Sequence, residues 1–223
     1  MGIVLPDGTD LAAAVTLPVS YVTALVALEQ CGRLRADETL LVHAAAGGAG
    51  LAAVQLGKAL GARVIGSAGS ASKRALAVAH GAETTVDYAD PHWVDEVRQA
   101  TGGRGADVIF DPVGGDVTAQ SLRCIAWDGR LLVVGFSSGK IPELPAHRLL
   151  LKRAAAIGVY WSHERDGPMV KTMEAKLVRM LGDGTIRPHV ERRAGLEALP
   201  QALTDLAARR SSGKLVLCLD APR

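Results

Sequence analysis

One short glycine-rich segment constrains the fold of this chain more than any other feature. Residues 42–50 read V-H-A-A-A-G-G-A-G and lie between an apolar run at 39–44 and a stretch at 51–60 whose apolar spacing is helical. This order predicts a strand, a glycine turn and a helix. Glycines lack the Cβ that keeps an anion at a distance, and the first-turn amides of a helix have no acceptor inside it. The segment therefore predicts a pyrophosphate site with a dinucleotide as its ligand.

The spacing of this turn is a variant of G-x-G-x-x-G, in which Ala44, Gly47 and Gly50 give A-x-x-G-x-x-G. Such a turn is also found as a plain tight connection, but residues 61–67 supply a second strand directly after the helix and complete a strand, helix, strand unit. We expect a valine at Gly47 or Gly50 to displace the ligand and to leave the domain folded. The turn residues predicted to contact the cofactor are Ala46, Gly47, Gly48, Ala49 and Gly50.

The same alternation continues along the chain. Further strands are predicted at 84–86, 108–111, 130–134 and 154–159, with helices at 72–80, at 93–101 and near 117–125. Short apolar strands that alternate with helices indicate a parallel sheet with helices on both faces. Residues 30–165 are therefore predicted to form an α/β domain with a doubly wound parallel six-stranded sheet, a Rossmann fold.

The two flanks, residues 1–29 and 166–223, do not follow this pattern. The first has a turn-rich start over 2–17 and then a buried helix that begins near Pro18. The second reads as helices at 169–181 and 196–208 and a strand at 214–219. We interpret both flanks as remnants of a second module.

Composition argues against several classes of partner. The net charge is +2, and no cluster of lysine and arginine is interleaved with aromatic residues, so nucleic acid is not expected as a partner. The longest uncharged stretch, 11–28, contains Thr16, Pro18 and Ser20, which favours a buried helix over a membrane span, and no basic segment precedes it as in a signal peptide. The three cysteines are far apart and give neither a disulfide framework nor a metal-binding spacing, so a cytoplasmic location is expected.

Four ordered motifs resemble one enzyme family. They are L-P-V-S-Y-V-T-A-L-V-A-L at 17–28, the segment from His43 to Ile65, D-P-V-G-G at 111–115 and R-L-L-V-V-G-F-S-S-G at 130–139. Together they resemble the zeta-crystallin-like quinone oxidoreductase branch of the medium-chain dehydrogenase/reductase superfamily. The resemblance implies that the family's N-terminal GroES-like catalytic module is missing and that the flanks are remnants of it. It also implies that the flanks would pack against that module, so that some apolar surface is left exposed or is covered by a second chain.

The comparison with this family also addresses metal binding. Its zinc-containing members place a cysteine ligand four residues before the threonine that corresponds to Thr23, whereas this chain has Val19 there. The six histidines are scattered without ligand spacing. No catalytic zinc is therefore expected.

The end of the second strand bears on the choice of dinucleotide. An NAD site usually has an acidic residue there, but residues 66–70 read G-S-A-G-S, and Lys73 follows in the next helix. A lysine and the turn with Ser67 and Gly69 suit a 2′-phosphate, which favours NADPH, although Lys73 is also explained as part of a solvated helix face. The resemblance implies that Lys73 and Tyr88 border the adenosine phosphate and that Arg210, or else Arg209, helps to hold the cofactor. Tyr88 is otherwise a surface aromatic packed beside a strand end.

At the nicotinamide end, the resemblance points to strand ends and to one helix. The residues concerned are Thr23, Gly135, Phe136 and Ser137, together with the segment 159–161. Packing in the core or in a dimer interface explains Phe136, Tyr160 and Trp161 equally well.

The leading functional hypothesis is an NADPH-dependent reductase that acts on a small-molecule quinone or an electron-poor alkene (enone). The sequence assigns no catalytic residue. The alternatives are an enoyl-thioester reductase and a catalytically inert NADPH-binding or dimerisation fragment. The sixth strand, 154–159, would leave an unpaired sheet edge, and in similar reductases this edge pairs across a twofold axis, so a homodimer is expected.

Overall fold

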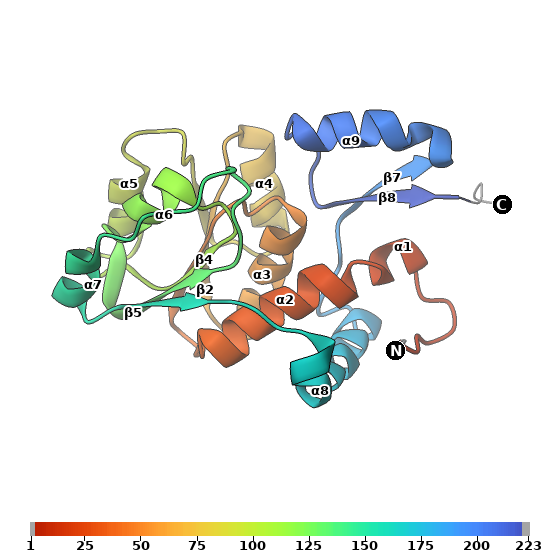
Figure 1. Ribbon diagram of the computed structural model, residues 1–223, viewed down its shortest axis with the longest axis horizontal. Helices are drawn as coiled ribbons and strands as arrows, with labels where there is room; N and C mark the ends of the chain where they lie inside the picture. The colour runs from red at the N-terminus through yellow and green to blue at the C-terminus, as the bar shows by residue number, and fades with distance from the viewer. Residues whose placement is uncertain (1–2, 220–223) are drawn as a thin grey trace.

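The computed structural model describes residues 3–219 and contains a six-stranded parallel sheet (Figure 1). The strand order is β3-β2-β1-β4-β5-β6. The strands are β1 (Thr39–Val42), β2 (Arg63–Ser67), β3 (Thr84–Val86), β4 (Ala106–Asp111), β5 (Ile125–Val133) and β6 (Ala155–Gly158). This order, with β1 and β4 adjacent at its centre, confirms the predicted doubly wound sheet.

Helices cover both faces of the sheet and divide the core in two. Alternate side chains of β1 point to opposite faces: Leu40 and Val42 join one buried cluster, and Leu41 joins the other. The helices that connect the strands are α3 (Gly48–Ala59), α4 (Ala71–Ala79), α5 (Trp93–Ala100), α6 (Gly115–Ser121) and α7 (Ala146–Lys152). Burial on both faces explains why the central strands are mainly apolar.

The N-terminal flank forms one long, partly π-helical rod. Its segments are α1 (Leu11–Ala14), η1 (Leu17–Tyr21), α2 (Val22–Leu25) and η2 (Val26–Cys31). The helix predicted from near Pro18 is confirmed, whereas α1 was missed; its cap is the carboxylate of Asp10, which accepts from the amide of Ala12 at 3.1 Å. The rod Leu11–Cys31 is long and apolar enough to cross a membrane, but 72% of its apolar window is buried inside the protein.

The C-terminal flank forms α8 (His163–Gly182) and a separate small unit. That unit consists of β7 (Val190–Ala194), η3 (Leu196–Ala198), α9 (Leu199–Ala207) and β8 (Lys214–Cys218), with β7 and β8 paired in parallel apart from the main sheet (Figure 1). Helix α8 begins six residues before the predicted start at 169, because Ser162 caps it and Pro168 is accommodated inside it. Residues 1–2 and 220–223, the outermost parts of the predicted flanks, lie outside the described residues.

Three further differences from the sequence prediction concern boundaries and new elements. The helix predicted near 117–125 ends at Ser121, and β5 begins at Ile125, because the carbonyl of Cys124 already accepts from Ala106 of β4. Helix α3 begins at Gly48, inside the glycine turn rather than after it. Helix α7 and strand β7 were not predicted.

The C-terminal unit is tied directly to the glycine turn. The amide of Gly213 donates to the carbonyl of Ala46 at 2.7 Å, and Gly213 forms an isolated parallel bridge with Gly47. The preceding segment, 208–212, is therefore held beside the turn that begins α3.

Candidate functional site

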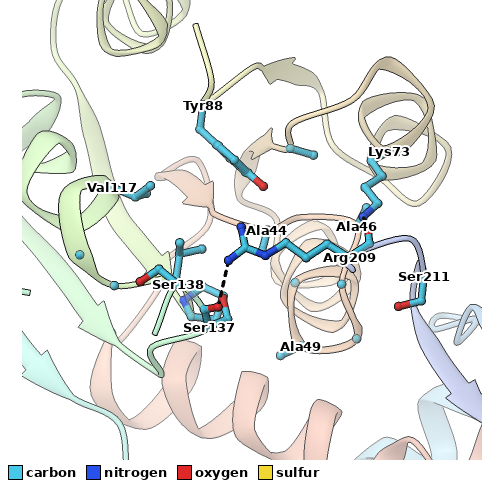
Figure 2. Close-up of a pocket in the computed structure, with 18 of the residues that line it drawn as sticks. Ala44, Ala46, Ala49, Lys73, Tyr88, Val117, Ser137, Ser138, Arg209 and Ser211 are labelled. Carbon is cyan, nitrogen blue, oxygen red and sulfur yellow. Dashed lines mark hydrogen bonds between the residues drawn. The ribbon is translucent and has the colours of Figure 1, made fainter. Parts of the chain in front are cut away.

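A cavity of about 790 Å³ lies where the strands of the main sheet end (Figure 2). The lining comes from the glycine turn, the ends of β2 and β3, Lys73 of α4, the loops after β4 and β5, and the C-terminal segment 206–211. Most of these segments follow the carboxyl ends of parallel strands, which is where open α/β sheets bind ligands. Of the predicted cofactor residues, the cavity brings together Ala46, Gly47, Gly48, Ala49, Gly50, Lys73, Tyr88 and Ser137.

The glycine turn presents free amides to this cavity. The first backbone hydrogen bond of α3 joins the amide of Leu51 to the carbonyl of Gly47 at 2.8 Å. The amides of Gly48, Ala49 and Gly50 precede that bond and have no acceptor within the helix. They also carry the positive end of a 12-residue helix dipole. This cradle suits a phosphate group.

The glycines of the turn serve different purposes. A Cβ at Gly50 would lie 2.1 Å from the carbonyl oxygen of Ala44, so Gly50 is required by the close approach of the turn to its own helix. A Cβ at Gly47 would meet only that same oxygen, at 3.3 Å. Gly50→Val would therefore clash with backbone, so a loss of ligand binding in that variant would not by itself place the ligand, whereas an added side chain at Gly47 meets little of the protein.

Cations predominate among the charged residues that line the cavity. They are Lys73, Lys140 and Arg209, against the single carboxylate of Asp116. The ammonium of Lys73 donates to the carbonyl of Arg209 at 2.6 Å. Figure 2 shows the side chain of Arg209 extended across the cavity, and its guanidinium donates to the carbonyl of Ser137 at 3.3 Å. The charge balance favours an anionic ligand.

The sequence offers two adjacent arginines, Arg210 and Arg209, as residues that hold the cofactor, and only one of them lines the cavity. Arg210 forms an ion pair with Asp205 at 2.9 Å and does not line the cavity, whereas Arg209 does. Arg209 has a φ of 56°, in the left-handed region, and this local backbone conformation accompanies the separation of the two side chains. Of the two arginines, Arg209 is therefore the one that lines the cavity.

Ser67 does not face the cavity. It is fully buried, and its hydroxyl lies 2.7 Å from Nδ1 of His43, whose Nε2 lies 2.7 Å from the hydroxyl of Ser121. Because Ser121 donates its only hydroxyl proton to the carbonyl of Val117, it accepts from Nε2, and Ser67 donates to Nδ1. Burial lowers the pKa of His43, which keeps this imidazole neutral.

Gly69 is exposed and is not among the residues that line the cavity. A Cβ at Gly69 would contact the ring and hydroxyl of Tyr88 at 3.5 Å, so the glycine packs beside that tyrosine. Tyr88 is partly buried and borders the cavity directly. The glycine thus shapes the position of Tyr88 and is not itself part of the lining.

The residues predicted at the nicotinamide end are only partly brought together. Ser137 lines the cavity, but Thr23, Gly135 and Phe136 do not. Thr23 instead accepts a hydrogen bond from the indole of Trp161 at 3.1 Å, which joins the N-terminal rod to the segment after β6.

The loop after β4 contributes lining residues that the sequence reasoning did not assign. The carboxylate of Asp111 accepts from the amides of Val113 and Gly114 at 2.8 and 3.2 Å and shapes this turn, and Gly114 has a φ of 78°. The motif D-P-V-G-G at 111–115 was a usable signal, because paired glycines after a strand indicate such a turn. The unassigned residues that line the cavity include Val113, Gly114, Asp116, Ser138, Lys140 and Ser211.

Side chains that could bind a metal are not clustered within the described residues. Within residues 3–219, no group of three or more histidine, cysteine, aspartate or glutamate side chains is arranged to hold a metal ion. The three cysteines are free.

Comparisons with known proteins agree on one family. The family model described as zinc-binding dehydrogenase matches residues 48–179. Quinone oxidoreductase-like protein 2 of Rattus norvegicus is 39% identical over 219 residues, which are 96% of this chain and 62% of that protein. The chain therefore spans less than two thirds of the length of such relatives.

Solved structures also match nearly the whole of this chain. The quinone oxidoreductase of Thermus thermophilus, also solved as its complex with NADPH, matches with a TM-score of 0.81 and 34% identity over 96% of this chain and 69% of that one. A structure named NAD-dependent alcohol dehydrogenase matches with a TM-score of 0.88 and 32% identity over 97% of this chain and 61% of that one.

Proposed function

The chain belongs to the zinc-binding dehydrogenase family, and from that premise we propose that it binds NADPH in the cavity and acts as an oxidoreductase on a quinone or an electron-poor alkene. One observation carries this proposal. The free amides of the glycine turn and the cations Lys73, Lys140 and Arg209 border the same cavity, whose volume of about 790 Å³ lies within the usual range for a small-molecule or cofactor site.

The residues present fit a dinucleotide with a 2′-phosphate. The amides of 48–50 would hold the pyrophosphate, and the absence of a side chain at Gly47 leaves room for it. Lys73 would hold the 2′-phosphate, with Tyr88 beside the adenosine, and Arg209, whose guanidinium reaches Ser137, would contact another part of the dinucleotide. When bound, NADPH supplies the hydride, and the protein supplies position and electrostatics.

The lining at the end of β2 favours NADPH over NADH. The segment 67–70 contains no acidic residue that would accept hydrogen bonds from two free ribose hydroxyls. Ser67 is committed to His43, which leaves Lys73 as the polar side chain of this region that borders the cavity. The NADPH complex of the Thermus thermophilus relative supports the same choice.

The flanks and the sheet edge suggest how the rest of the protein is assembled. We propose that the segments 3–29 and 166–219 belong to a second, catalytic module. Strand β6 pairs with β5 alone among the described strands, and Tyr160 just after it is 80% exposed. We therefore propose a homodimer through β6, since a bare apolar edge promotes association.

A binding titration followed by a turnover assay tests the proposed function. We expect NADPH to bind more tightly than NADH in isothermal titration calorimetry, and we expect NADPH oxidation with a panel of quinones and enones. Turnover of enoyl thioesters alone would favour an enoyl-thioester reductase. Binding without turnover of any acceptor would support the inert NADPH-binding fragment, and failure to bind NADPH would overturn the proposal.

A further inference from the structure

An acidic residue lies near the adenosine end of the cavity, although the segment that follows β2 contains none. Asp87 follows β3 directly and precedes Tyr88, which lines the cavity. The guanidinium of Arg74 in α4 lies 2.6 Å from the carboxylate of Asp87. The side chains of Arg74 and Asp87 are 26% and 31% exposed, so water screens this pair less than a fully exposed one.

Arg74 connects the two loops that form this end of the cavity. Besides Asp87, its guanidinium donates to the carbonyl of Ala68 at 3.1 Å, and Ala68 is itself a lining residue. The second carboxylate oxygen of Asp87 accepts from the amide of Ala89 at 2.9 Å. One arginine therefore fixes both the loop after β2 and the carboxylate at the start of the loop after β3.

The neighbouring cations of α4 have different electrostatic roles. The charge of Arg74 is balanced by Asp87, whereas Lys73 contacts only a carbonyl, that of Arg209, and forms no ion pair within residues 3–219. The positive charge of Lys73 is thus left for a ligand. Without Arg74, the negative charge of Asp87 would be unbalanced beside the cavity, where it would repel a 2′-phosphate and would attract Lys73.

We propose that Arg74 is a positioning residue that determines cofactor specificity by neutralising Asp87 and by holding the Ala68 carbonyl. This inference rests on the proposed function, because it assumes that a dinucleotide lies in the cavity. It assigns the preference for NADPH to two features: the lysine that contacts the phosphate, and the masking of a carboxylate behind it.

The test compares variants that unmask the carboxylate with variants that remove it. We expect R74Q to reduce the ratio of NADH to NADPH dissociation constants about tenfold, mainly through weaker NADPH binding, because it leaves an unbalanced charge near a dianionic phosphate. D87N should raise the ratio, because it frees the charge of Arg74. The double variant R74Q/D87N should return the ratio to within about twofold of the unmodified chain, since charge neutrality is restored.

Calorimetric binding and thermal melting distinguish this role from a structural one. If R74Q weakens NADPH and NADH equally, or if the double variant keeps the full loss of selectivity, the inference is wrong. If R74Q does not fold, D87N decides the matter, because an unchanged ratio in D87N would contradict the proposed masking. An unmodified chain that binds no dinucleotide, or that prefers NADH, would instead overturn the proposed function itself.

Discussion

The substitution Gly50→Ala tests how the glycine turn is built. At most positions inside a helix, replacing glycine by alanine stabilises the protein by about 1 kcal/mol. Here the new Cβ would lie 2.1 Å from the carbonyl oxygen of Ala44 and 2.8 Å from its carbonyl carbon, whereas real Cβ atoms essentially never approach within 3.0 Å. These neighbours are backbone atoms, so the clash cannot be relieved by rotating a side chain.

Relief of this clash requires the turn to move away from α3. Overpacking of this kind costs about 1–3 kcal/mol. The movement also strains the hydrogen bond from the amide of Gly47 to the same carbonyl, now 2.8 Å long, and such a bond is worth about 1 kcal/mol. After the gain in helix propensity is subtracted, we expect a net loss of about 2 kcal/mol, which lowers the melting temperature of a chain of this length by roughly 4–8 °C.

Gly48→Ala is the matched control for this experiment. Its Cβ would lie 3.4 Å from the carbonyl of Gly213 and 3.4 Å from the hydroxyl of Ser20, which are ordinary contacts. Differential scanning calorimetry should show Gly48→Ala melting near the unmodified chain and Gly50→Ala melting well below it. If Gly50→Ala melts at or above the temperature of the unmodified chain, the close approach at Ala44 does not require glycine and the reasoning is refuted.

Three further predictions concern pH, metal and assembly. Burial lowers the pKa of His43 below the value of about 6.5 that it has when unfolded, so the folded state binds fewer protons and the free energy of unfolding should fall as pH drops below that value. Urea unfolding between pH 7.5 and 5.5 should show that the free energy of unfolding depends less on pH in His43→Gln than in the unmodified chain. Equal pH dependence in the two proteins would contradict this. Elemental analysis should find no stoichiometric zinc, whereas one zinc per chain, removable with loss of stability, would contradict the metal-free account. Light scattering should find a dimer that Tyr160→Glu weakens, and a monomer at high micromolar concentration with a normal melting transition would argue against pairing through β6.

The main sheet was predictable because its strands are buried on both faces. Strand β4 is buried along its whole length and is apolar at its centre, where the sequence reads V-I-F, and the glycine turn marks where the first strand ends. Strand β7 could not be found in the same way. Its sequence, V-E-R-R-A, carries three charged residues and is partly exposed, and its partner β8 begins 20 residues after β7 ends. Its pairing depends on distant contacts that a local pattern does not contain.

The candidate site shows the same limit at the level of single side chains. The sequence places Ser67 at a strand end, but it does not show that the hydroxyl points to His43, 24 residues earlier in the chain. The sequence also offers two adjacent arginines, and it does not show that Arg209, whose backbone is left-handed, is the one that lines the cavity. The interpretation that no acid lies at the adenosine end considered the loop after β2 alone, whereas the fold brings Asp87 beside it from β3.

The most direct test of the central claim, that the cavity binds NADPH, is a calorimetric titration of the unmodified chain and of Lys73→Ala with NADPH and NADH. The account predicts that the unmodified chain binds NADPH more tightly, and that Lys73→Ala loses roughly tenfold in NADPH affinity, because a charge-assisted contact with phosphate is worth about 1.5 kcal/mol, while NADH affinity hardly changes. Equal losses for both cofactors would remove Lys73 from the phosphate site, and the absence of any NADPH binding by the folded, unmodified chain would contradict the account as a whole.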